Sequence, residues 1–199
     1  MNKEILQKIG IRVGTLVAFL CIAFSFVLLS HSSSNGVVFA QSNSNTTEFK
    51  ALRDQYLQSW EKLNFQSVLD TYVVGGTDSG YGVYEERGSN TFAPGETLYL
   101  YVEPVAFSHK QTLDSKGNTL YSIDMSADIT ITSSGTIVAS IKNFPVSKLV
   151  SHQKNTEVFL LLSLLQSQPF PKGEYEITYV VKDNPSGKTF DIVKNIKIA

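Results

Sequence analysis

Residues 121–132 restrict the fold more than any other part of the sequence, because apolar and polar side chains alternate along them without a break. The odd-numbered positions are apolar: Tyr121, Ile123, Met125, Ala127, Ile129 and Ile131. The even-numbered positions are polar: Ser122, Asp124, Ser126, Asp128, Thr130 and Thr132. Successive side chains of a strand point to opposite faces of a sheet, so this pattern predicts one long strand with one face in a core and one in water.

A second alternating segment, residues 91–107, begins with a turn. Proline presets φ and glycine accepts a positive φ, so Pro94-Gly95 suits the two central turn positions. The strand that follows has one apolar face, formed by Leu98, Leu100 and Val102. Its other face carries two phenols and a carboxylate, from Tyr99, Tyr101 and Glu103. Pro104 cannot donate a ladder hydrogen bond, so we expect the strand to end, bulge or lie at an edge there.

The remaining alternating or apolar segments predict further strands at residues 81–85, 136–141, 157–165, 175–181 and 190–198. Residues 157–165 are apolar on both faces, which fits either a helix or a strand buried on both sides, and we favour the strand. The apolar phase of the last strand is disturbed around Lys194, which indicates a bulge or an edge. Turns are predicted at residues 114–118 and 183–188, and residues 142–155 have the composition of a long polar loop.

Residues 48–72 are predicted to form an N-terminal helix. Apolar side chains recur there at spacings of three and four, at Phe49, Leu52, Tyr56, Trp60 and Leu63. Trp60 lies on this stripe and is expected to be a packing anchor. An apolar stripe needs a cover, so we expect the helix to pack on the strands, over the face that carries Tyr99 and Tyr101.

About seven predicted strands with short turns, preceded by one helix, define the expected fold class. It is mainly β: an immunoglobulin-like antiparallel β-sandwich, over residues 80–199, preceded by one amphipathic α-helix. The segment Pro171-Lys172-Gly173-Glu174-Tyr175 resembles the tyrosine corner of such domains, in which a phenol bonds back across the turn. The Cys…Trp…Cys pattern of antibody domains is missing, so a domain of the antibody type is not expected.

Several segments together carry a family resemblance: Phe92-Ala93-Pro94-Gly95-Glu96, residues 101–107, the strand from Asp124 to Ile131, the corner at residues 171–175, and Ser186-Gly187-Lys188. With these segments the chain resembles, over roughly residues 80–199, a family of exported prokaryotic proteins of uncharacterised function. The resemblance implies export and an immunoglobulin-like sandwich. It carries over no catalytic residues.

Residues 1–40 have the pattern of a secretory signal, with basic residues at the start, an apolar run over residues 13–29, and the small Ala40 at the end. We expect cleavage between Ala40 and Gln41. The alternative is an uncleaved anchor, because about 17 apolar residues is the lower limit for crossing a bilayer. In both cases the remainder is exported, either secreted or held on the outer face of the cytoplasmic membrane, and it meets the membrane only through this N-terminal segment.

Residues 41–47 are small and polar, as expected of a linker. Asn45-Thr46-Thr47 is a glycosylation sequon, which makes Asn45 a candidate for modification, although an unmodified linker explains the segment equally well.

Composition excludes several kinds of chemistry. Cys21 is the only cysteine and lies in the leader, so disulfides, thiol nucleophiles, iron–sulfur clusters and cysteine-based zinc sites are not expected in the mature domain. The leader holds three of the 17 basic and one of the 18 acidic residues, which leaves 14 against 17, a net charge of −3. The mature sequence has no basic stripe, so nucleic acid is not an expected partner.

No residues form a recognisable cofactor or catalytic motif. Glu103, His109 and His152 would form a metal site only if their loops met, and exposed loop histidines are the simpler interpretation. Asp124 and Asp128 lie about 13 Å apart along one strand, too far to share one calcium ion. Ser151-His152 are sequence neighbours, which is not how a catalytic triad is built. Glu103 is interpreted first as a carboxylate that accepts hydrogen bonds from backbone or from Arg87, and second as a functional group.

The sequence therefore predicts an exported binding or accessory module without catalytic activity, whose partner is an unknown protein or envelope ligand. The face of Tyr99, Tyr101 and Glu103 and the loop at residues 108–118 are its candidate binding surfaces. A metal-binding protein or metal-dependent enzyme that uses Glu103, His109 and His152 is the alternative. A proteinase-inhibitor-like or chaperone-like domain that offers a sheet edge is a second alternative, based on fold analogy alone.

Overall fold

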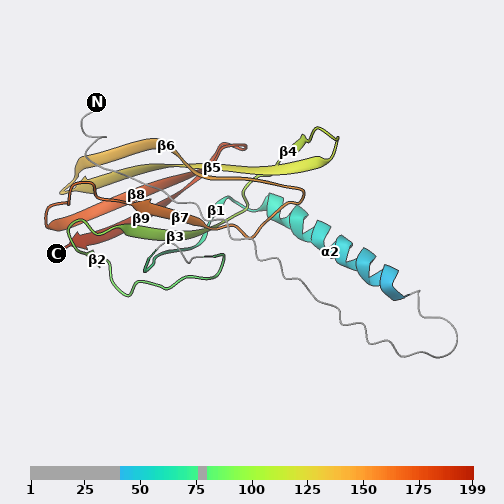
Figure 1. Ribbon diagram of the computed structural model, residues 1–199, viewed down its shortest axis with the longest axis horizontal. Coiled ribbons are helices and arrows are strands. Elements are labelled where there is room, and N and C mark those ends of the chain that lie inside the picture. Colours follow the sequence, from blue (N-terminus) through green and yellow to red (C-terminus); the bar gives the residue numbers. More distant parts are fainter. Residues whose placement is uncertain (1–40, 76–79) are drawn as a thin grey trace. The chain divides into compact units, whose positions relative to one another are not determined.

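The computed structural model describes residues 41–75 and 80–199 (Figure 1). The chain divides into two compact units, with the boundary between Leu63 and Asn64. One contains helix α2 (Gln41–Lys62) and the other contains the strands. These are β1 (Gln66–Tyr72), β2 (Thr91–Phe92), β3 (Leu98–Val105), β4 (Lys110–Leu113), β5 (Thr119–Ser133), β6 (Thr136–Ser151), β7 (Leu160–Leu164), β8 (Gly173–Asp183) and β9 (Lys188–Ile198). The prediction of a mainly β protein with one helix in front is confirmed.

The nine described strands form two sheets. The smaller sheet has the order β1-β3-β7 and is antiparallel throughout. The larger one has six strands: β2, β9, β8 and β5 follow one another, while β4 and β6 also pair with β5. All pairs of the larger sheet are antiparallel except β2 with β9, which run parallel.

Strand β5 is the centre of the larger sheet and confirms the strand predicted at residues 121–132. It pairs with β8 on one side and with β6 on the other. Its apolar residues from Ile123 to Ile131 are at most 2% exposed. We expected the polar face to lie in water, but Asp128 on that face is only 9% exposed. Its carboxylate lies 2.7 Å from the Lys182 amine and 3.1 Å from the Lys142 amine, so lysines of the two neighbouring strands enclose it.

Strand β3 is the centre of the smaller sheet. The predicted turn precedes it, with Gly95 at φ 83° and a hydrogen bond from the Glu96 N–H to the Ala93 carbonyl oxygen. Pro104 lies opposite Ser67, and the register shift next to it falls in β1, between Ser67 and Leu69, while β3 continues through Pro104 to Val105. The pairing with β7 ends at Val102, which leaves the edge of β3 at Pro104 without a ladder partner on that side among the described residues.

The segments around β7, β8 and β9 agree with the sequence in three respects. Strand β7 lies within residues 157–165 and is buried along its whole length, as predicted. The Tyr175 hydroxyl donates to the Pro171 carbonyl oxygen at 2.8 Å, which is the bond expected of a tyrosine corner. The predicted hairpin turn follows β8, and there the buried Asp183 carboxylate accepts hydrogen bonds from the Ser108 N–H and the Ser186 hydroxyl.

Two predictions about residues 64–85 are wrong. The helix begins at Gln41, inside the expected linker, and ends at Lys62, while residues 66–72 form strand β1 rather than the end of the helix. Thr71 and Tyr72 pair with Tyr101 and Leu100 of β3. The backbone groups of this segment are therefore satisfied by hydrogen bonds to β3 and not by those of a helix, which local propensity favoured. Residues 81–85 are not a strand and make only isolated bridges.

Residues 142–151, predicted to belong to a polar loop, instead continue strand β6. The whole length of β5 offers a free edge for pairing, and β6 follows it with three register shifts. Among the described residues β6 has no other hydrogen-bonded neighbour, so Pro145 is tolerated there. Asn143, at φ 53°, marks one of the irregular points.

Lys194 causes no bulge in β9, because the register with β8 is continuous across it. It occupies an inward position between Ile192 and Ile196, which are buried. Its amine donates to the Asp70 carbonyl oxygen at 2.9 Å and lies 2.7 Å from the Asp70 carboxylate. Lys194 therefore interrupts the apolar pattern of β9 because it forms an ion pair that links the edges of the two sheets.

Helix α2 exposes most of its predicted stripe: Phe49, Leu52, Tyr56 and Leu63 are at least half exposed. Trp60 is buried, and its ring lies 6.1 Å from that of Tyr56. That this helix packs on the strands stays a prediction. In the part of the chain that the structure describes, no helix has the length and apolar character needed to span a bilayer. The apolar run at residues 13–29 and the expected cleavage site at Ala40 lie outside the described residues.

Candidate functional site: the tyrosine loop

The outer face of the smaller sheet carries a second small core. Val73, Tyr101, Phe159 and Leu161 form it, with Leu69 and Tyr99 partly buried against it. Tyr101 is fully buried and stacks on Phe159, with ring centroids 5.5 Å apart. The face predicted to bind a partner through Tyr99 and Tyr101 is therefore covered.

Residues 80–86, which we call the tyrosine loop, provide part of this cover. The ring of Tyr84 lies 4.5 Å from that of Tyr101. The loop is joined to the sheet at one end by backbone hydrogen bonds, from the Val74 N–H to the Glu85 carbonyl oxygen at 2.9 Å and from the Arg87 N–H to the Tyr72 carbonyl oxygen at 2.8 Å.

The Tyr101 hydroxyl holds the other end of the loop. It accepts a hydrogen bond from the Gly82 N–H at 2.8 Å, and it lies within donating distance of the Gly80 carbonyl oxygen at 3.0 Å and the Glu103 carboxylate at 2.7 Å. The same Glu103 oxygen accepts from the Gly82 N–H at 3.2 Å. Gly82 has φ 68°, a conformation that favours glycine, and it brings the loop backbone onto these two side chains.

Glu103 thus accepts hydrogen bonds from backbone, as the sequence suggested, but its partner is not Arg87. Arg87 instead binds Glu96, with the closest nitrogen–oxygen distance 2.6 Å, and lies 4.2 Å above the centre of the Phe92 ring. Burial first, and then the hydrogen bond to Glu103, raise the pKa of Tyr101 well above its ordinary value. The phenol therefore stays protonated and acts as a hydrogen-bond donor that holds the loop.

A set of exposed apolar side chains comes from this loop and from Val74, which is hydrogen-bonded to Glu85. We call it the tyrosine patch; it consists of Val74, Tyr81, Val83 and Tyr84, whose exposures are 53%, 40%, 61% and 36%. Sequence reasoning missed these residues, because it placed Tyr81 and Val83 in a strand. The glycines on both sides of Tyr81 were the available signal, since paired glycines favour a loop over a strand.

The residues proposed to bind a metal are not brought together. In the described ranges no group of three His, Cys, Asp or Glu residues is arranged to hold a metal ion. Glu103 is engaged with the tyrosine loop, and the Nε2 atom of His109 lies 2.7 Å from the Asn155 carbonyl oxygen. His152 is exposed.

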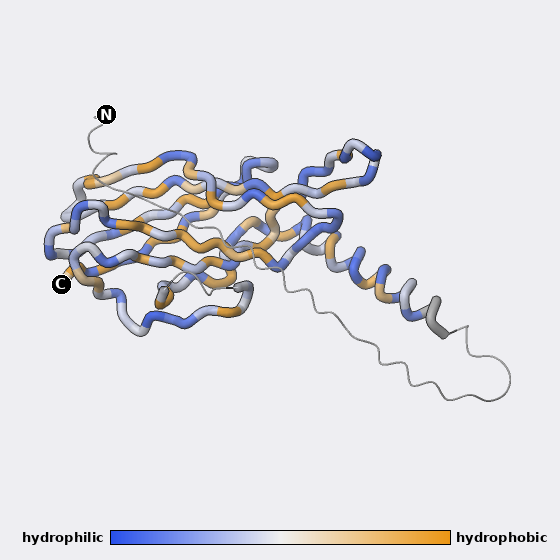
Figure 2. The backbone as a smooth tube through the Cα atoms, viewed as in Figure 1, coloured by the Kyte–Doolittle hydropathy of each residue, from blue (hydrophilic) through white to orange (hydrophobic). Residues whose placement is uncertain are grey.

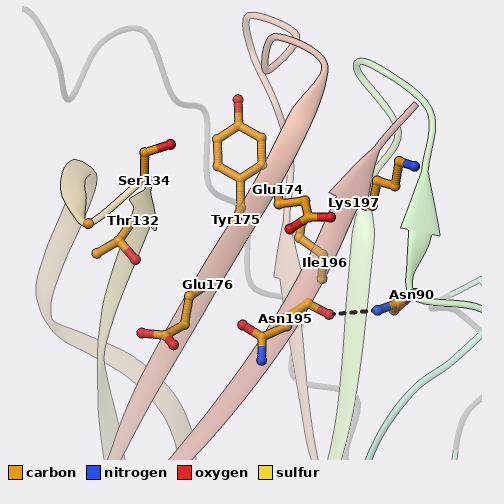
Figure 3. A pocket seen from close by; sticks show the side chains of 10 residues that line it. Asn90, Thr132, Ser134, Glu174, Tyr175, Glu176, Asn195, Ile196 and Lys197 are labelled. Atoms are coloured by element: carbon orange, nitrogen blue, oxygen red, sulfur yellow. Dashed lines mark hydrogen bonds between the residues drawn. The ribbon is translucent and has the colours of Figure 1, made fainter.

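A polar hollow of about 510 Å³ lies elsewhere, on the outer face of the larger sheet (Figure 3). Its lining includes Glu174 and Glu176 of β8, Thr132 of β5 and Asn195 of β9. The Asn90 side chain donates to the Asn195 carbonyl oxygen at its rim. The hollow is an exposed polar face of the larger sheet.

Comparisons with known proteins do not assign the chain to a family: no protein-family model matches it, and no curated protein sequence matches it. The site is therefore interpreted from its own geometry.

Proposed function

We propose that the protein is an exported binding module without catalytic activity, and that the tyrosine patch is its contact surface. One observation carries the proposal: Tyr81, Val83 and Tyr84 are exposed on a loop that the buried Tyr101 hydroxyl fixes in place. Exposed apolar groups on a preorganised loop lose little conformational entropy on binding, and tyrosine is enriched among the residues that dominate binding energy. Figure 2 shows the hydropathy of the residues along the described backbone.

Site-specific photo-cross-linking tests this function. A photoreactive amino acid is placed at Val83, and the matched control is placed at Ile137, which is 63% exposed on β6 of the other sheet. In cells that export the chain, we expect Val83 to give a discrete cross-linked product that Ile137 does not give. The product should disappear when Tyr81→Ala is added. Equal products from both positions, or none from Val83, would contradict the proposal.

The finer fold assignment, an immunoglobulin-like sandwich, is part of the same proposal. The strand order β9-β8-β5-β6 corresponds to G-F-C-C′ of such domains, and β3-β7 corresponds to B-E. The tyrosine corner supports this correspondence, because Tyr175 lies near the start of β8, where strand F begins. An experimental structure with a different sheet order would overturn it.

Export rests on the sequence of residues 1–40, and the resemblance to exported prokaryotic proteins agrees with it. N-terminal sequencing of the mature protein decides between cleavage before Gln41 and an uncleaved anchor. The two alternative functions have direct tests as well: metal analysis of the purified protein for the metal-binding hypothesis, and a protease panel for the inhibitor-like hypothesis.

A further inference from the structure

The charges of the β unit are divided unequally between its two parts. Residues 64–107, which contain β1, the tyrosine loop and β3, hold six acidic residues against one basic residue, a net charge of −5. Residues 108–199 hold eight acidic residues against ten lysines, a net charge of +2. The tyrosine patch therefore lies in the strongly acidic part of a protein whose mature net charge is only −3.

The carboxylates of the tyrosine loop, and Glu103 that is bonded to it, lack a cationic partner among the described residues. Arg87 is paired with Glu96, and Lys194 is paired with Asp70. Glu85 and Glu86 follow Tyr84 directly and are exposed, and both have no cationic partner within salt-bridge distance in the described part of the chain.

Glu103 accepts a hydrogen bond from the Gly82 N–H, and it likewise has no cationic partner among the described residues. Three carboxylates without a cationic partner among the described residues thus belong to the tyrosine loop or are hydrogen-bonded to it. A partner that covers the patch must partly desolvate them, and this is costly unless the partner supplies opposite charge.

We propose that the occupant of the tyrosine patch is a cationic protein segment, with an apolar side chain flanked by lysine or arginine. This inference rests on the proposed function of the patch. The carboxylates and the tyrosine rings favour the same kind of partner. Carboxylates pair with ammonium and guanidinium groups, and the faces of Tyr81 and Tyr84 attract cations. Anionic partners such as acidic lipid surfaces would be repelled by the same carboxylates.

Peptide binding to the full mature chain, followed by NMR, tests the inference. The probes are three short peptides of equal length with one central leucine, flanked by arginine and lysine, by glutamine, or by glutamate. We expect only the cationic peptide to shift the resonances of Tyr81, Val83 and Tyr84. Its affinity should fall several-fold between about 50 mM and about 500 mM salt, because the Debye length shortens from about 14 Å to about 4 Å.

Matched variants locate the effect. The double variant Glu85→Gln, Glu86→Gln should weaken binding of the cationic peptide about twofold to thirtyfold, from about 0.2–1 kcal/mol for each of two exposed ion pairs. The control Glu174→Gln, Glu176→Gln removes the same charge from exposed positions on the larger sheet and should leave the affinity unchanged.

The outcomes separate the inference from the proposed function. If the three peptides bind equally well, or if none shifts the patch, a cationic partner is excluded. The cross-link from Val83 then decides the proposed function by itself. If that cross-link persists and the Glu85 and Glu86 variant does not weaken it, the patch binds a partner that is not cationic. If the cross-link is also missing, both proposals fail.

Discussion

Replacing Tyr101 by phenylalanine is the sharpest test of how the tyrosine loop is held. The substitution keeps the ring that stacks on Phe159 and removes only the hydroxyl. That hydroxyl accepts one hydrogen bond from the Gly82 N–H and donates one, shared between the Gly80 carbonyl oxygen and the Glu103 carboxylate. A neutral hydrogen bond contributes about 1 kcal/mol net, and one to a charged group about 1.5–3 kcal/mol.

The expected loss is about 2 kcal/mol, because Gly82 keeps its weaker bond to Glu103 and recovers part of the energy. Hydrogen exchange of the Gly82 amide reports local opening of the loop, and urea denaturation followed by circular dichroism reports the free energy of global unfolding. We expect Tyr101→Phe to accelerate exchange at Gly82 by about tenfold or more, whether or not global unfolding changes to the same extent.

Tyr179→Phe is the matched control. Tyr179 is as buried as Tyr101, and its hydroxyl interacts only with the Tyr72 hydroxyl, without a hydrogen bond of normal geometry in the described part of the chain. Removing an unsatisfied hydroxyl is neutral or slightly stabilising. If Tyr101→Phe and Tyr179→Phe change stability equally, and exchange at Gly82 stays as in the wild type, the Tyr101 hydroxyl does not hold the loop.

Three further predictions concern the framework. The pKa of Asp128 is about 2, because hydrogen bonds and ion pairs with lysines outweigh the effect of burial. The free energy of unfolding should therefore decrease as the pH falls from about 4 towards 2. Asp128→Asn should cost about 1–2 kcal/mol at neutral pH, and urea titrations at a series of pH values should show a weaker decrease in stability below about pH 4. Tyr175→Phe should cost about 1 kcal/mol by losing the tyrosine-corner bond, measured as a lower urea midpoint with an unchanged slope. Lys194→Met should destabilise by about 1 kcal/mol because it leaves the Asp70 carboxylate unpaired, and the double variant with Asp70→Asn should recover part of this loss in thermal denaturation.

Local pattern predicted the elements whose period is clear. The alternation along residues 121–132 and the turn at Pro94-Gly95 are confirmed because each depends on neighbours in sequence. The tyrosine corner was also visible, since Tyr175 and Pro171 are only four residues apart. These features need no knowledge of which strands pair.

Elements set by pairing were not predicted. Residues 66–72 follow a helical segment and resemble its continuation, yet they join β3, while residues 142–151 have loop composition and follow β5. In both cases a distant strand offers an unpaired edge. Its hydrogen bonds outweigh weak local propensity, as is usual for sheets.

For the candidate site, the sequence by itself determined that Tyr101 and Glu103 share one face of a strand, since alternation places them there. Only the tertiary structure decided what that face does. The smaller sheet buries Tyr101 beneath the tyrosine loop, and its hydroxyl becomes a support while Tyr81 and Val83 are exposed. The physical reason is that a strand pattern separates two faces without specifying their cover. Which residues meet solvent depends on a loop about twenty residues away in sequence, held by a hydrogen bond between Gly82 and Tyr101.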